Sequence, residues 1–240
     1  MGILIDLFDH SGNAAEPYRK NGWIVIQVDL KLGTDILTWD YQMAIFNAIK
    51  PELHYLKMPD FGLLAAIPCT DYATSGAKHF AKKDANGQTK QSQLLVKKVE
   101  EIKTFIEKYW KLKFWKIENP RTRIHKLNPW IGKITQKFNP CDFAGYINPT
   151  FEQLNSIEHL RQIGIKDALK SEIQLVNDLN LYNKETWLFG NFNKLQTKPI
   201  ASVWKENPGW VLYGGKSERT KELRSIDPKG YCLAFYEANH

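Results

Sequence analysis

The chain has 240 residues, of which 43% are hydrophobic and 25% charged, a composition typical of a globular α/β protein with an ample core. Its three widely spaced cysteines argue against a disulfide framework or a zinc site, so we expect a reduced protein without a bound metal. No stretch is long and apolar enough for a transmembrane helix or arranged as a secretory signal, so no membrane partner is expected, and the oligomeric state is not predicted.

The net charge of +7 is unevenly distributed along the chain. Residues 81–140 carry 15 Lys and Arg against 5 Asp and Glu, whereas residues 1–80 are acidic and residues 141–240 are balanced. A basic middle segment is typical of a surface that binds a polyanion such as DNA. A solvated, lysine-rich helix face would have the same composition, and composition alone does not separate the two.

The first elements read as a βαβ unit. Residues 3–8 form an apolar run, residues 14–20 suit a short helix, and residues 23–28 form a second apolar run that ends at Asp29. An acidic residue after the second strand is typical of nucleotide-binding sheets, where it binds ribose hydroxyls. Of the glycine-rich fingerprint only Gly12 is present, and an aspartate at this point is also a common turn residue.

A short helix over residues 41–49 precedes the strand around which the chain is organised. Leu63 to Ile67 is an unbroken apolar run, which suits a strand buried on both faces of a parallel sheet. Pro68 ends that run and places Cys69 at the carboxyl end of the strand, where open α/β sheets carry their functional groups. A thiol there is either a nucleophile or a small buried apolar group.

The segment from residue 70 to residue 90 is polar and lacks periodicity, so we expect a long mobile loop, with disorder as the alternative. The clearest helix follows over residues 91–109, with Leu95, Val99, Ile102 and Ile106 along one face. Residues 112–117 then form a strand that ends at Glu118, and a carboxylate there is costly unless it has a function or a partner.

After this strand the pattern is weaker. A basic stretch that begins at Arg121 suits contacts with phosphates. A second Pro-Cys pair ends at Cys141, but no buried strand precedes it, so it is the weaker nucleophile candidate. Residues 154–181 are expected to be helical and residues 186–189 to form a further strand.

Five short motifs occur in one order along the chain, namely Phe8-Asp9-His10-Ser11-Gly12, Asp29, Asp35-Ile36, Pro68-Cys69-Thr70 and Ile117-Glu118-Asn119-Pro120. With them the chain resembles the DNA cytosine-5 methyltransferases, and most of all the small phage-type members of that family. The resemblance covers residues 3–120, and more weakly residues 182–190 and the C-terminus.

The resemblance implies a fold and a cellular setting. The fold would be a Rossmann-like S-adenosylmethionine-dependent methyltransferase sheet with helices on both faces. Residues 1–150 would be the catalytic and cofactor-binding core, residues 151–215 a variable and possible DNA-contacting region, and residues 216–240 a segment that returns to the core. Few residues lie between Gly190 and Arg224, which implies a reduced or absent target-recognition domain. The cytoplasm of a bacterium or of a phage-infected host cell is the implied location.

The resemblance also implies a catalytic set. Cys69 would add to carbon 6 of a flipped cytosine, which makes carbon 5 nucleophilic toward a methyl donor. Glu118 would hold or protonate the ring nitrogen, and Asn119 would position its neighbours. Lys184 stands where the family has an arginine, so it keeps the charge and loses the bidentate fork.

The implied methyl donor is S-adenosylmethionine and the implied partner is DNA. The cofactor-binding positions are Phe8, His10, Gly12, Asp29, Asp35, Ile36 and Pro68. The positions expected to contact DNA phosphates are Lys78, Lys82, Lys83, Arg121 and Arg123. His10 occupies a position where the family has glycine, and we expect its side chain to point away so that the cofactor still binds.

Two other interpretations are open from the sequence. A homologue with altered or lost cofactor use could modify a base differently or bind DNA without catalysis, and a histidine that fills the cofactor pocket would favour it. A redox or cysteine-hydrolase enzyme built on Cys69 is less well supported, because no suitably placed histidine is identifiable.

Overall fold

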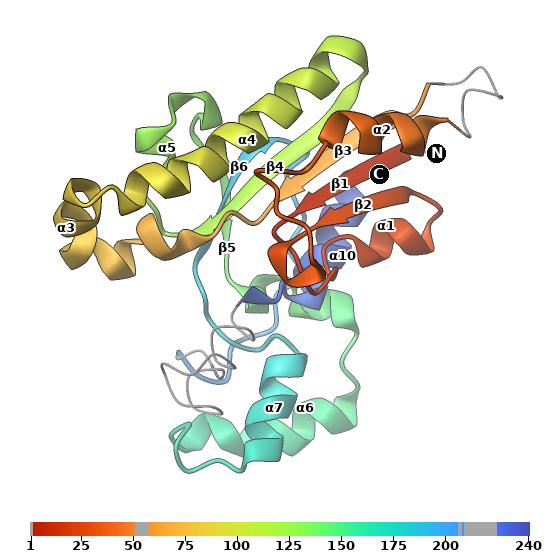
Figure 1. Ribbon diagram of the computed structural model, residues 1–240. Helices are drawn as coiled ribbons and strands as arrows, with labels where there is room; N and C mark the ends of the chain where they lie inside the picture. Colours follow the sequence, from red (N-terminus) through yellow and green to blue (C-terminus); the bar gives the residue numbers. More distant parts are fainter. Residues whose placement is uncertain (1, 51–57, 206–207, 209–224) are drawn as a thin grey trace. The chain divides into compact units, whose positions relative to one another are not determined.

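The computed structural model describes residues 2–50, 58–205, 208 and 225–240, coloured along the chain in Figure 1. The chain divides into two compact units, each described separately below. The first comprises residues 1–137, 186–194 and 239, and the second comprises residues 138–185, 195–238 and 240. The sequence-based boundary at residue 150 lies within the second unit, and residues 186–191 return to the sheet of the first unit.

The first unit is built on a six-stranded sheet with the order β2-β1-β3-β4-β6-β5. The strands are β1 (Gly2–Leu7), β2 (Ile24–Val28), β3 (Asp60–Ala65), β4 (Leu112–Pro120), β5 (Ile134–Phe138) and β6 (Thr186–Asn191). The pairs β1–β2, β1–β3 and β3–β4 are parallel, whereas β4 and β6 run antiparallel. The protein therefore has an α/β fold with a mostly parallel mixed sheet, as the sequence predicts at that level.

Helices lie on both faces of this sheet. They are α1 (Glu16–Lys20), α2 (Tyr41–Ile49), α3 (Phe80–Ala85), α4 (Gln88–Tyr109) and α5 (Ile124–Leu127). The apolar sides of α2 and α4 pack on one face, in a core that includes Ile5, Leu63 and Ile117. On the other face Tyr18 of α1 packs against Phe114 of β4, with their rings 5.6 Å apart.

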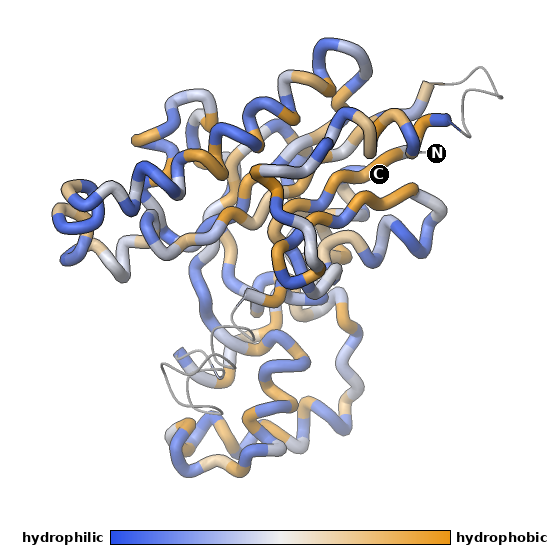
Figure 2. Tube along the Cα trace, viewed as in Figure 1, coloured by the Kyte–Doolittle hydropathy of each residue, from blue (hydrophilic) through white to orange (hydrophobic). Residues whose placement is uncertain are grey.

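The hydropathy pattern explains why these elements form. In Figure 2 the central strands are largely hydrophobic, which suits burial on both faces, and α4 alternates between hydrophobic and hydrophilic positions. Val99, Ile102 and Ile106 of α4 are fully buried, as its predicted stripe requires. The helix begins three residues before its predicted start and ends at the predicted Tyr109.

Three sequence expectations about local structure are wrong. Residues 70–90 are not an unstructured loop, because two 3-10 helices, α3 and the first turn of α4 occupy this segment. The strand expected over residues 112–117 continues to Pro120, so Glu118 and Asn119 lie within β4. The helix expected over residues 154–181 is interrupted at residues 163–169, between a 3-10 turn and α7.

The second unit has its own helices and core. Among its described residues the α-helices are α6 (Phe151–Glu158), α7 (Lys170–Asp178) and α10 (Lys229–Ala238), and a 3-10 segment covers Pro140–Ile147. Buried residues such as Leu160, Val176 and Trp204 form one cluster, and the Trp204 indole donates hydrogen bonds to the carbonyls of Leu160 and Ile163. The predicted variable region and C-terminal segment fall partly on residues 206–207 and 209–224, which lie outside the described residues.

Candidate active site at the carboxyl edge of the sheet

The strands that follow β1 in the chain lie on opposite sides of it in the sheet. From β1 the chain passes to β2 on one side and then to β3 on the other, which creates a switch point between the carboxyl ends of β1 and β3. In open α/β sheets ligands bind in the crevice at such a point. Leu7, Val28, Ala65 and Ile117 lie in one row across β1, β2, β3 and β4. The segments that follow this row carry the predicted motifs, so the register brings them to the same edge.

The loop after β1 is held by its own aspartate. Asp9 is buried, and its carboxylate accepts hydrogen bonds from the backbone N–H groups of Ser11 (2.9 Å), Gly12 (3.0 Å) and Ala14 (3.2 Å). Gly12 has a φ of +70°, which favours glycine at this position. The loop therefore has a defined conformation, and Asp9 fixes it although the sequence analysis assigned it no role.

Phe8 begins this loop with an uncommon backbone. Its φ is +66°, in the left-handed region that bulky side chains seldom occupy. Its N–H donates to the carbonyl of Val28 at 2.8 Å, and the N–H of Ala66 donates to Leu7 at 3.0 Å. These bonds tie the β1 loop to both neighbouring strands and hold the strained residue in place. His10, two residues later, is half-buried.

The predicted adenosine-binding residues lie in the turns after β2. Asp29 is half-buried, and its Oδ1 accepts the N–H of Lys31 at 2.7 Å. Asp35 is exposed and caps the next turn by accepting the N–H of Leu37 at 2.9 Å. Ile36 is 4% exposed and belongs to the apolar core. Both aspartates thus shape their turns, and the second oxygen of each carboxylate can accept further hydrogen bonds.

Cys69 lies in a short 3-10 turn after β3, and its side chain is partly accessible. The exposed Pro68 precedes it, and the carbonyl of Cys69 accepts the N–H of Ala73 at 2.8 Å. Asn119 connects this turn to the neighbouring strand, because its Nδ2 donates to the carbonyl of Ile67 at 2.8 Å. Asn119 is therefore bonded to the backbone two residues before Cys69.

Glu118 is buried on the other face of β4 from Asn119. Its carboxylate forms an ion pair with Lys116 at 3.0 Å, and the two residues are only 7% and 2% exposed. Residues two apart on a strand share a face, so this pairing follows from strand geometry. The ammonium group of Lys116 is the opposite charge that the buried carboxylate of Glu118 requires. A lysine in the middle of the apolar Phe114–Ile117 run is the sequence signal that could have identified it.

The other cysteine candidate has a different environment. Cys141 belongs to the second unit, is 9% exposed, and its thiol donates to Oδ1 of Asn183 at 3.3 Å. Burial, with the nearby charge of Asp142, raises the pKa of the Cys141 thiol. A buried thiol with a raised pKa is a poor nucleophile, which leaves Cys69 as the better placed of the two. Lys184 also lies in the second unit and is half-buried.

The predicted phosphate contacts fall into two groups. Lys78, Lys82 and Arg121 are exposed. Lys83 and Arg123 instead bind groups within the first unit, at Asp71 and Asp84 respectively. In this conformation only the first group presents its charge to solvent.

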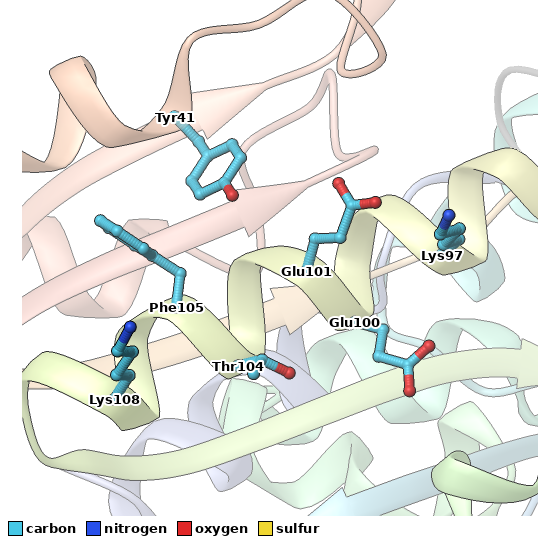
Figure 3. Close-up of a pocket in the computed structure, with 7 residues that line it drawn as sticks. All are labelled: Tyr41, Lys97, Glu100, Glu101, Thr104, Phe105 and Lys108. Carbon is cyan, nitrogen blue, oxygen red and sulfur yellow. The ribbon is translucent and has the colours of Figure 1, made fainter.

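A surface pocket lies away from these residues, between Tyr41 and the outward side of α4 (Figure 3). Glu100, Glu101 and Lys108 contribute charges of both signs to its lining, and Phe105 packs edge-on against Tyr41. None of the predicted site residues lines it. We assign this pocket no ligand.

Comparisons of the chain with protein-family models, with curated proteins and with solved structures found no match. Within the described residues, no helix is long and apolar enough to cross a membrane.

Proposed function

We propose that the protein is a DNA cytosine-5 methyltransferase that transfers a methyl group from S-adenosylmethionine to carbon 5 of a flipped cytosine. The observation that carries this proposal is the joining of two predicted catalytic segments at one sheet edge. The Asn119 side chain holds the turn that presents Cys69, and Glu118 is the adjacent residue on β4. The sheet is compatible with a Rossmann-like methyltransferase fold, with an antiparallel β6 beside β4.

The residues at the switch point suit a nucleoside cofactor. Asp29 lies directly after β2, where it could accept hydrogen bonds from ribose hydroxyls on its second oxygen. The half-buried ring of Phe8 offers an apolar contact at the end of β1. When bound, S-adenosylmethionine would supply an electrophilic methyl group carried on a sulfonium.

The thiolate of Cys69 has the central role in the proposed chemistry. It adds to carbon 6 of the cytosine, which forms a carbon–sulfur bond and moves an electron pair to carbon 5. Carbon 5 would then be nucleophilic toward the methyl group that bound S-adenosylmethionine would supply, with the bonding electrons left on the donor sulfur. Transfer of the carbon 5 proton to a water molecule acting as base then lets the carbon–sulfur bond break, which releases the Cys69 thiolate and restores the aromatic ring. Because carbon 6 is inaccessible in stacked DNA, the base must leave the duplex first.

Glu118 would stabilise the charge that develops during the addition. As electrons enter the ring, the nitrogen beside the carbonyl becomes basic, and a carboxyl group there can hold or deliver a proton. Lys116, at 3.0 Å, places a buried positive charge beside this carboxylate. Asn119 contributes by fixing the Cys69 turn.

Incubation of the protein with duplex DNA and radiolabelled S-adenosylmethionine tests this proposal. We expect label in DNA, and nucleoside analysis should identify 5-methylcytosine. Label in another base would contradict the cytosine assignment. DNA binding without transfer would contradict the enzyme and support a homologue that has lost or changed its cofactor.

The exposed cations lead to a prediction about salt. If Lys78, Lys82 and Arg121 contact phosphates, each should contribute roughly one unit to the slope of log affinity against log salt. The triple alanine variant should therefore bind DNA with a slope shallower by about three, measured by fluorescence anisotropy at several salt concentrations. Lys20→Ala, which removes an exposed charge from α1, is the control. An unchanged slope in the triple variant would show that these charges only face solvent.

A further inference from the structure

The strongest unassigned feature is a cluster of charged residues behind the Cys69 turn. Asp71 lies two residues after the thiol and is 3% exposed. Its carboxylate accepts hydrogen bonds from Lys83 at 2.8 Å, from Gln88 at 3.0 Å and from Ser92. Burial by itself would raise the pKa of Asp71, but the bonds from Lys83 and Ser92 and the nearby positive charges lower it overall. The turn is thus bonded to α3 and α4 through one ionised side chain.

Arg123, which directly precedes α5, completes the cluster. Two of its nitrogens bind the two oxygens of Asp84, at 2.7 and 2.8 Å, in the bidentate geometry particular to arginine. Its Nε donates to the backbone carbonyl of Asp71 at 3.2 Å, and its guanidinium lies 3.7 Å from the centre of the Phe80 ring. The hydrogen bond from Arg123 lowers the pKa of Asp84 to about 2, so the pair stays charged at neutral pH.

The backbone joins the same two segments. The N–H of Arg123 donates to the carbonyl of Tyr72 at 2.9 Å, and the N–H of Thr74 donates to Arg121 at 2.9 Å. Ala73 and Thr122 form an isolated antiparallel bridge between these bonds. The chain after Cys69 is therefore paired with the chain after Asn119, by backbone bonds and by the charged side chains together.

We propose that Asp71, Lys83, Asp84 and Arg123, here named the turn clamp, are positioning residues that hold Cys69 at a defined place in the turn after β3. The role of the clamp in catalysis rests on the proposed function, whereas its effect on the position of the Cys69 thiol does not. Lys83 and Arg123 therefore serve the turn rather than DNA phosphates. Asp71, Lys83 and Asp84 lie in the segment from residue 70 to residue 90, which the sequence predicts to be a mobile loop.

The test measures Cys69 directly, by iodoacetamide labelling resolved by peptide mass spectrometry. Arg123→Ala should speed alkylation of Cys69 by roughly tenfold, because loss of the fork lets the turn open locally. Arg123→Lys keeps the charge without the fork and should fall between wild type and Arg123→Ala. The charge swap of Arg123→Asp with Asp84→Arg should restore part of the slow rate. Lys20→Ala, an exposed ion pair on α1, should leave the rate unchanged.

The possible outcomes distinguish failure of the clamp proposal from failure of the proposed function. A global fold defect would also expose the buried Cys141 and Cys232 and lower the melting temperature, so Arg123→Lys serves where Arg123→Ala does not fold. Unchanged Cys69 alkylation in both folded variants, or no recovery in the charge swap, would overturn the clamp. Faster alkylation in a protein that transfers no methyl group would uphold the clamp and reject the proposed function. In an active wild type, the same variants should lose kcat more than DNA affinity.

Discussion

Replacing Cys69 by alanine is expected to abolish covalent capture of the protein on DNA that contains 5-fluorocytosine. Fluorine at carbon 5 cannot leave as a cation, so the adduct between the thiolate and carbon 6 persists once the methyl group has been transferred. Wild type should therefore migrate as a protein–DNA complex on a denaturing gel when S-adenosylmethionine is present. Because alanine has no nucleophile, the expected effect is complete loss and not a reduction.

Cys141→Ala is the matched control for this experiment. Cys141 is also preceded by a proline, but it is buried, and burial raises the pKa of its thiol. Its loss should leave capture intact. Capture that survives in Cys69→Ala, or disappears in Cys141→Ala while the fold is retained, would move the nucleophile to the other cysteine.

Much of the first unit could be predicted from the sequence because its strands are short apolar runs. Residues 63–67 illustrate this, since a run with no polar side chain indicates an element buried on both faces, although β3 itself runs from Asp60 to Ala65 and so begins and ends earlier than the predicted strand. The turn residue Pro68 then places Cys69 after β3, where the structure has it. The helix over residues 41–49 was likewise predicted with the bounds that the structure gives to α2.

The contacts of the site could not be predicted, because they join residues distant in sequence. Asp71 and Lys83 read as polar loop residues, and their ion pair appears only when α3 folds back against the Cys69 turn. The sequence predicts that Arg123 contacts a phosphate because it shows the positive charge of Arg123. It does not show that Asp84, 39 residues earlier, binds this charge in the folded protein. The strand β5 was missed because Ile134–Phe138 mixes polar and apolar residues and is only partly buried.

For Glu118 the sequence predicts that the carboxylate needs a function or a partner, but it does not identify the partner. Its place at the end of an apolar run marked it as a carboxylate with a function or a partner. The structure gives it a partner in Lys116, which the sequence analysis did not consider. A test of its catalytic role must therefore separate the loss of a reacting group from the loss of a buried ion pair.

Glu118→Gln is expected to lower methyl transfer by on the order of 100-fold or more while DNA affinity stays near that of wild type. The amide keeps the size of the side chain, but it carries no charge and cannot exchange a proton with the ring. Because the carboxylate acts on charge that develops during thiolate addition, the loss should appear in the chemical step. Single-turnover rates, with DNA binding measured separately by anisotropy, distinguish the two effects.

Stability supplies the control. Removing one partner of a buried ion pair typically costs about 3–5 kcal/mol, so Glu118→Gln alone should also unfold at lower urea concentration. Adding Lys116→Met removes the buried ammonium that Glu118→Gln leaves unpaired. The double variant should therefore recover much of the lost stability, because burying an apolar side chain of similar size has no desolvation cost for a charge. The double variant should still be inactive if Glu118 takes part in the chemistry. Recovery of near-wild-type transfer in the double variant would instead mean that Glu118 only neutralises Lys116, and the Glu118-Asn119 match would then carry no catalytic meaning.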